Sequence, residues 1–170
     1  MRELDQLNPV KSVSLVKGFK PPTAIDLLPP ISSAALFNGV KKILKKYPII
    51  NAYLFGSQAT GKTTKFSDYD VGIELTPGLK PENIFNLKIK LSADLAKLLK
   101  TKVDIVVMND KKTPTLLNFN IIKDGRLIYS QAKNKRVALE VSIMREWRDW
   151  QYYENLWSDI YNKKIAENKI

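Results

Sequence analysis

Two aspartates separated by one residue, Asp68 and Asp70, are the side chains best suited to chemistry in this sequence. They precede an alternating apolar run, residues 71–75, that is typical of a strand. On a strand, residues i and i+2 share a face about 7 Å apart, and at an effective dielectric near 20 two carboxylates at that distance repel each other by about 2 kcal/mol. A hard cation would relieve this repulsion, and Mg²⁺ commonly takes one or two protein carboxylates together with substrate phosphates. The pair therefore predicts a magnesium site for a phosphate-bearing substrate.

A second feature, the pair Gly56-Ser57, follows the apolar run 49–55 as a buried strand would enter a tight turn. Because glycine lacks a Cβ, the backbone N–H groups of such a turn can approach a phosphate, with the serine hydroxyl beside them. The stretch predicts a strand, a small-residue turn, a polar loop and a second strand. The turn is the expected site of the nucleotide phosphates.

The same stretch also fits the P-loop pattern, because Gly56 is followed by Gly61-Lys62-Thr63 at the required spacing. A P-loop opens directly into a helix whose N-terminus holds the phosphates. Here four residues separate Thr63 from Asp68, which is too short for a helix. We therefore favour a loop, in which Lys62 is either solvated or reaches a nucleotide phosphate by another geometry; a P-loop NTPase is the alternative.

The spacing of these motifs, Gly56-Ser57, ten residues, then Asp68-x-Asp70, resembles the signature of the DNA polymerase β-like nucleotidyltransferases, in the form found in the minimal nucleotidyltransferases. The likeness covers roughly residues 33–130, and it implies a third acidic residue at Asp104. It further implies that the three aspartates hold two Mg²⁺ ions. One ion would hold the triphosphate of ATP on the glycine turn, and the other would activate an acceptor hydroxyl with Asp104 as ligand and base. The chain departs from the family at Thr60, where many relatives carry arginine.

The resemblance also implies a partner. Minimal nucleotidyltransferases of this size commonly pair with a small helical HEPN-domain protein as the antitoxin of a toxin–antitoxin system, and transfer AMP to a tyrosine of that partner. Two other functions stay open. One is a catalytically weak binding module that neutralises a partner by contact through its carboxy-terminal helix. The other is transfer to a small molecule, as in aminoglycoside nucleotidyltransferases, which usually carry an additional helical domain that is not evident here.

The amino-acid composition excludes several kinds of metal site. The chain has no cysteine and no histidine, so disulfides and thiolate or histidine metal sites are excluded and carboxylates must carry any metal chemistry. It has no transmembrane run and no apolar signal-peptide core, so we expect a cytoplasmic protein without a membrane partner. A net charge of +11 suits polyanions such as ATP or nucleic acid. The lysines are dispersed along the chain, however, and nucleic acid is not favoured as the main partner.

Three segments are predicted from the periodicity. Residues 1–31 are proline-rich and read as an extended arm. Residues 32–130 predict an α+β nucleotidyltransferase domain, a small mixed sheet flanked by helices, in which Glu74 is a solvated or lysine-paired side chain. Residues 131–170 predict a helix that reaches about residue 165 and packs on the domain or on a partner. Its expected apolar stripe consists of Val137, Val141, Met144, Trp147, Trp150, Tyr153, Leu156 and Ile160.

This carboxy-terminal segment carries more large aromatics than one core-facing stripe can hold: Trp147, Trp150, Tyr152, Tyr153, Trp157 and Tyr161. We therefore expect at least two of them to be exposed. Tryptophan and tyrosine dominate the energetics of protein interfaces. The excess predicts contact with a second copy of the chain or with a HEPN-like protein, unless the helix only covers the sheet.

Overall fold

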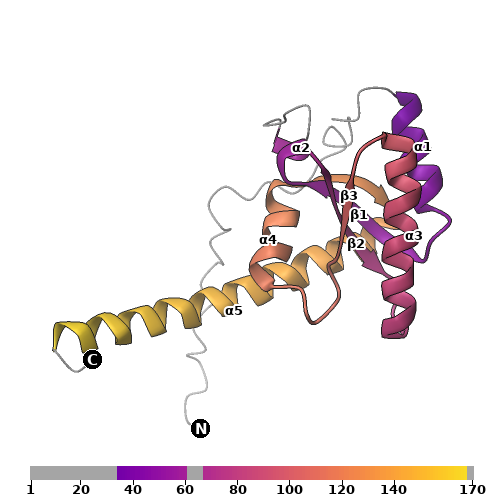
Figure 1. Ribbon diagram of the computed structural model, residues 1–170. Coiled ribbons are helices and arrows are strands. Elements are labelled where there is room, and N and C mark those ends of the chain that lie inside the picture. The colour runs from indigo at the N-terminus through magenta and orange to yellow at the C-terminus, as the bar shows by residue number, and fades with distance from the viewer. Residues whose placement is uncertain (1–33, 61–66, 168–170) are drawn as a thin grey trace, which may run out of the picture.

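The computed structural model describes residues 34–60 and 67–167. It confirms the expected α+β class: a sheet carries helices on both faces, and a long carboxy-terminal helix extends past the body (Figure 1). The predicted arm, residues 1–31, and Lys62 lie outside the described residues. In chain order the elements are α1 (Ala34–Leu44), β1 (Ile49–Phe55), α2 (Ser57–Thr60), β2 (Tyr69–Leu75), α3 (Pro81–Leu99), β3 (Val103–Val107), α4 (Thr115–Asp124), β4 (Arg126–Ser130) and α5 (Lys133–Ala166).

The described strands form one mixed sheet in the order β3-β2-β1-β4. β1 pairs antiparallel with both β2 and β4, and β2 pairs parallel with β3, with α3 as the crossover between them. This topology brings the carboxyl end of β1 and the amino ends of β2 and β3 to the same end of the sheet. The turn and the aspartates singled out in the sequence lie at that end.

The two faces of the sheet have separate apolar cores. On one face, α1 and α3 pack over side chains of β1, β2 and β3, with Leu91 and Leu95 of α3 fully buried. On the other face, α4 and the first half of α5 pack over Tyr53 of β1. Each buried leucine contributes about 1.5–3 kcal/mol relative to an exposed one, so the two cores support this end of the sheet. None of the helices in the described ranges combines the length and apolarity needed to cross a bilayer.

The stretch between β1 and β2 differs from the expected loop, because residues Ser57–Thr60 form a single helical turn, α2. The N–H groups of Ala59 and Thr60 donate to the carbonyl of Gly56 at 3.2 Å. The Thr60 hydroxyl also donates to that carbonyl, at 3.3 Å. The sequence predicted a turn at Gly56-Ser57 but not its helical form, because four residues are too few to show an apolar period.

Helix α5 confirms the predicted extent, but its buried face differs from the predicted stripe. Val137 and Val141 are 42% and 48% exposed, whereas Glu140 and Ile143 are buried. The buried Glu140 accepts a hydrogen bond of 2.7 Å from the hydroxyl of Tyr53. The stripe was wrong at Val137 and Val141, whereas Met144 and Trp147 do pack against the core. An apolar pattern cannot indicate a buried glutamate, which is tolerated here because it is hydrogen-bonded.

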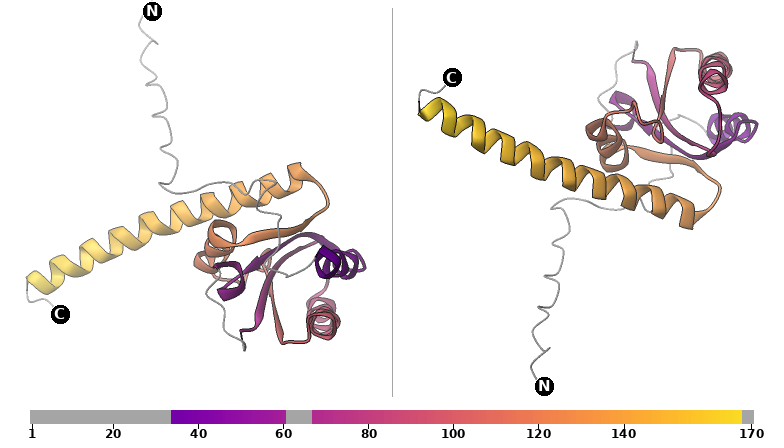
Figure 2. Two further views of the ribbon diagram at one scale, coloured as in Figure 1. Left: turned by 90° about the horizontal axis from the view of Figure 1, so that it is seen from above. Right: turned by 90° about the horizontal axis from the view of Figure 1, so that it is seen from below.

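The second half of α5 leaves the body altogether. Every residue from 148 to 167 is exposed, and Figure 2 shows this part of the helix running clear of the sheet and the other helices. Trp147 stacks on Phe119 of α4 with ring centroids 4.5 Å apart, which ends the packed part. The expectation of at least two exposed aromatics is confirmed. Those that are 40% exposed or more are Trp150, Tyr152, Tyr153, Trp157 and Tyr161.

Candidate active site

The turn after β1 is built against the second aspartate. Gly56 has φ +69°, a conformation that side-chain-bearing residues rarely adopt. A Cβ placed on it would collide with Oδ2 of Asp70. Position 56 therefore needs glycine for two reasons: the backbone conformation and the close approach of the Asp70 carboxylate. Ser57 follows directly as the first residue of α2 and is partly buried.

The aspartates come from two neighbouring parallel strands. Asp70 is paired in register with Phe55 on β1 and with Asp104 on β3. Asp68 lies before β2, which begins at Tyr69, so it approaches the same corner from the incoming chain rather than from within the strand. The structure thus gathers Asp68, Asp70 and Asp104 at one corner beside the Gly56 turn.

A lysine that the motif search did not single out occupies this acidic corner. The Lys102 ammonium lies 2.9 Å from Oδ2 of Asp104 and 3.5 Å from Oδ2 of Asp68. The hydrogen bond and the charge of Asp104, together with the charge of Asp68, raise the pKa of Lys102. The side chains are 65%, 52% and 41% exposed, so each ion pair is worth little in stability. The strand alternation that predicted the aspartates could also have predicted this lysine, since it precedes Asp104 by two residues.

Asp70 is partly buried at this corner, and its pKa is raised. Partial burial raises its pKa, the charges of Asp104 and Asp68 raise it further, and Lys102 lowers it. A cation brought to this corner would oppose the two charge effects. The repulsion anticipated from the sequence is therefore present in the folded chain.

The donor set fits magnesium by its chemistry, because three carboxylates supply hard oxygen ligands and an ammonium already stands in for a cation. Within residues 34–60 and 67–167, no three acidic side chains converge closely enough to form a ready-made metal cage. Asp68, Asp70 and Asp104 are the residues that would hold a bound Mg²⁺, and Lys102 would compete with it for Asp68 and Asp104.

Two contacts fix α2 and have no signal in the sequence pattern. Arg126 of β4 donates from Nε to the carbonyl of Ala59 at 3.1 Å. The Gln58 amide donates to the carbonyl of Ser67 at 3.1 Å, which ties α2 to the entry of β2. These contacts hold the turn that faces Asp70.

Glu74 is not part of the corner, and of the two expected environments, solvated or lysine-paired, the structure shows a partly buried side chain that feels the charge of Lys135. It is partly buried, near the other end of β2, and accepts a hydrogen bond from the side-chain amide of the buried Asn51. Burial raises its pKa, while the Asn51 bond and the charge of Lys135 lower it. Its role is structural.

The P-loop alternative does not fit this arrangement. A P-loop strand leads into a helix that begins after the lysine, within a unit whose strands run parallel. Here β1 and β2 are antiparallel, and the helical turn begins at Ser57, before the position of Lys62. Gly56 faces an aspartate rather than the N-terminus of a long helix.

The comparisons with known proteins agree with this geometry. The family described as Polymerase beta, Nucleotidyltransferase matches residues 38–134, which is more than half of the chain. A protein of Methanocaldococcus jannaschii named "Putative protein adenylyltransferase MJ1379" is 37% identical over 75 residues, which are 44% of this chain and 73% of that protein.

Solved structures share the fold. A chain of a toxin–antitoxin complex with AMP-PNP superposes with a TM-score of 0.61 at 21% identity, covering 72% of this chain and 95% of that one. A chain of the complex between the tri-AMPylated HEPN toxin of Shewanella oneidensis and its MNT antitoxin gives 0.57 at 19% identity, covering 74% and 94%. Sequence, topology and the acidic corner lead to one conclusion: the chain belongs to the polymerase β nucleotidyltransferase family of enzymes.

Proposed function

We propose that this chain is a magnesium-dependent protein adenylyltransferase that transfers AMP from ATP to a tyrosine of a HEPN-domain partner, as the antitoxin of that pair. The observation that carries the proposal is the placement of the Gly56 turn against Asp70, with Asp70 in register with Asp104. A phosphate-binding turn and an acidic corner are thereby within reach of one bound nucleotide. The protein acceptor is supported by the name of the M. jannaschii relative and by the AMPylated toxin of the S. oneidensis complex.

Some residues of the site would bind the ATP, and others would activate the acceptor hydroxyl. The backbone N–H groups after Gly56 and the hydroxyl of Ser57 would bind the triphosphate, with Lys62 as a further phosphate contact. Mg²⁺ held by Asp68, Asp70 and Asp104 would neutralise phosphate charge and lower the pKa of the acceptor hydroxyl. Asp104 would accept the hydroxyl proton.

The bond changes follow from this arrangement. The acceptor oxygen bonds to the α-phosphorus of ATP, the bond from that phosphorus to the α–β bridging oxygen breaks, and pyrophosphate leaves. The nucleophile and the leaving oxygen must lie roughly in line. Pre-orientation of this kind is a large part of the acceleration available to such a site.

The exposed half of α5 would bind the partner. Most helical stability in proteins comes from the packing of one face, whereas residues 148–167 are all exposed and Trp150, next to the packed part, stacks on Trp147. Trp157 and Tyr152 are 68% and 66% exposed. Burial of these rings against a helical partner would stabilise both the helix and the complex. A second copy of the chain is the competing occupant, and sedimentation of the isolated protein distinguishes it.

The test uses a HEPN-domain protein from the same genome, incubated with this chain, ATP and Mg²⁺, and followed by intact-protein mass spectrometry. We expect the HEPN protein to gain the mass of one or more adenylyl groups on tyrosine, and the gain to be lost with Asp70→Asn. An unmodified HEPN protein in a stable complex would refute the transfer. If Asp70→Asn also relieves HEPN toxicity as fully as the wild type, neutralisation is by contact alone.

A further inference from the structure

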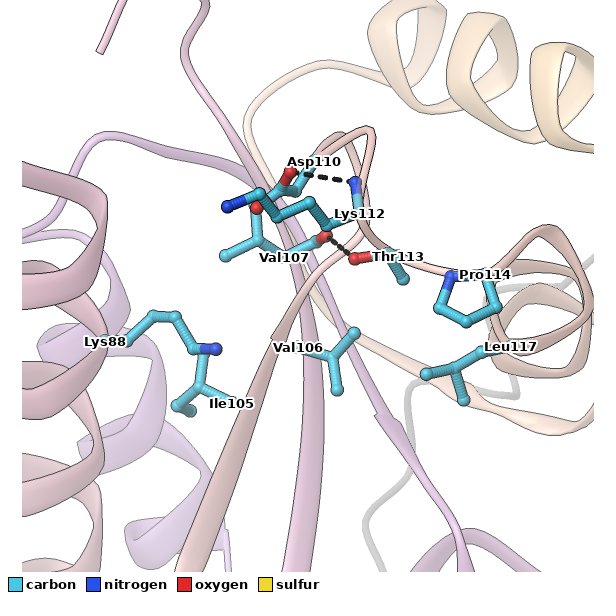
Figure 3. A pocket seen from close by; sticks show the side chains of 9 residues that line it. All are labelled: Lys88, Ile105, Val106, Val107, Asp110, Lys112, Thr113, Pro114 and Leu117. Atoms are coloured by element: carbon cyan, nitrogen blue, oxygen red, sulfur yellow. Dashed lines mark hydrogen bonds between the residues drawn. The ribbon is translucent and has the colours of Figure 1, made fainter. Parts of the chain in front are cut away.

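The outer edge of β3 carries a groove that the proposed reaction does not yet use. It consists of two hollows of about 510 and 350 Å³ that share Lys88 and Ile105. α3 forms one wall, and the segment 110–114 with the start of α4 forms the other. Figure 3 shows the smaller hollow, with Lys88 and Ile105 on the side of α3, and with Pro114 and Leu117 opposite. We refer to the two hollows together as the edge groove.

The backbone in the middle of this edge is open. The N–H of Tyr69 donates to the carbonyl of Lys102, and the N–H of Met108 donates to that of Ile73. In parallel register, even-numbered residues of β3 therefore bond to β2 and odd-numbered ones face outward.

The outward carbonyls at the two ends of β3 already accept hydrogen bonds from side chains. The carbonyl of Val103 accepts from the Ser92 hydroxyl at 2.6 Å, and the carbonyl of Val107 accepts from the Thr113 hydroxyl at 2.7 Å. Within the described chain, the outward N–H and C=O of Ile105, between these two residues, make no hydrogen bond. One residue of an extended peptide could bond to both groups, as peptides do at sheet edges.

The edge groove also has apolar walls on both sides of Ile105. Phe85 and Ile89 of α3 are 64% and 54% exposed and line the larger hollow, whereas Val106 and Leu117 line the smaller one. Successive side chains of an extended peptide point to opposite sides, so its neighbours could enter the two hollows alternately. The charged groups at the groove are Lys88, Lys112 and Asp110 in addition to Asp104.

The position of the groove matches the direction of acceptor approach. From the Gly56 turn on β1, the sheet order leads through Asp70 on β2 to Asp104 on β3, and Asp104 itself lines the larger hollow. With pyrophosphate leaving on the side of the turn, an in-line acceptor must arrive from the side of β3. The groove lies on that side.

We propose that the edge groove binds an extended segment of the acceptor polypeptide, bonded to the backbone of Ile105 and anchored by an apolar side chain on Phe85 and Ile89, and that it directs the acceptor hydroxyl to Asp104. The direction of delivery rests on the proposed function. Peptide binding in the groove does not, since it needs neither nucleotide nor metal.

The experiment selects a displayed library of random dodecapeptides on the immobilised full chain and measures the affinity of the enriched peptides by fluorescence polarisation, without ATP or Mg²⁺. The variant Ile89→Lys places a lysine in the groove. The matched control Asn86→Lys places one at an exposed position of α3 that does not line it. Both are surface changes, and equal melting temperatures establish that both fold.

We expect the enriched peptides to carry apolar residues at alternate positions. They should bind Ile89→Lys at least tenfold more weakly than the wild type and bind Asn86→Lys with unchanged affinity. In the complex, hydrogen exchange at the Ile105 amide should be slower than in the free chain. Enriched tyrosine peptides should be adenylylated with a KM that rises in Ile89→Lys while kcat holds. Failure to enrich any peptide above the bare support, or equal affinity for both variants, would overturn the groove proposal. Binding without adenylylation would instead count against the proposed function.

Discussion

Replacement of Gly56 by alanine tests how closely the phosphate turn and the acidic corner depend on each other. At φ +69° the alanine backbone is strained by roughly 1–2 kcal/mol. Its Cβ would also collide with Oδ2 of Asp70, so the carboxylate must leave its rotamer at a further cost of about 0.5–1.5 kcal/mol. We expect the free energy of unfolding to fall by about 1.5–3.5 kcal/mol in total. The displaced carboxylate should lower kcat/KM for AMP transfer by roughly 100-fold, the scale expected for a misplacement near 1 Å.

The chain offers a matched control in Gly78. It has φ +89°, so alanine there carries a comparable backbone strain, but the added Cβ meets nothing within 4 Å. Urea unfolding and AMP transfer would be measured for both variants. Gly78→Ala should lose about 1–2 kcal/mol of stability and retain the wild-type transfer rate. If Gly56→Ala transfers AMP as fast as Gly78→Ala, the contact between the turn and Asp70 has no catalytic importance and our reasoning fails.

Further predictions concern the acidic corner and α5. The pKa of Asp70 is raised above its usual 3.8 in the folded chain, so the native state retains a proton that the unfolded chain releases. Without metal, the free energy of unfolding should therefore fall as the pH rises from 3.8 through the titration of Asp70. Asp70→Asn should flatten this part of the plot of unfolding free energy, measured with urea, against pH. Mn²⁺ should raise the calorimetric melting temperature, and Asp68→Asn with Asp70→Asn should abolish the rise; an identical response in the double variant would remove the proposed metal site. Lys102→Gln should tighten Mn²⁺ binding about tenfold, measured by titration calorimetry, because the competing ammonium is gone. The control Lys97→Gln, at an exposed position, should leave Mn²⁺ binding unchanged. Equal effects of the two variants would indicate only a change in net charge. Trp157→Ala should weaken partner binding by roughly 2 kcal/mol or more and leave the melting temperature unchanged, and unfolding without a change in association would place that ring in a structural role.

The sequence was sufficient for the parts of the site that depend on local spacing. Alternation along one strand predicted that Asp68 and Asp70 share a face, and the family resemblance added Asp104, which the structure pairs in register with Asp70. The sequence predicted a glycine turn at position 56 as a phosphate site, and the structure adds a second reason for glycine, since Asp70 fills the space of a Cβ. The α+β class and the mixed sheet were predictable because the apolar periodicity extends over the longer helices and strands.

Contacts between distant segments were beyond the reach of these patterns. Arg126 steadies α2 through a bond to Ala59, and no spacing rule connects residues so far apart in the chain. Glu140 is buried because Tyr53, on another element, donates to it. The same limit applies to the aromatics of α5: spacing could not separate Trp147, which stacks on Phe119, from Trp157, which is exposed.

The most direct test of the central claim follows both ends of ATP in the same reaction. Purified chain, Mg²⁺ and the HEPN acceptor would be incubated with ATP labelled at the α-phosphate in one sample and at the γ-phosphate in another. We predict that the α label appears on the acceptor and the γ label in pyrophosphate, in equal amounts, and that Asp70→Asn abolishes both. Release of the γ label as orthophosphate, unaffected by Asp70→Asn, would contradict nucleotidyl transfer by the acidic corner.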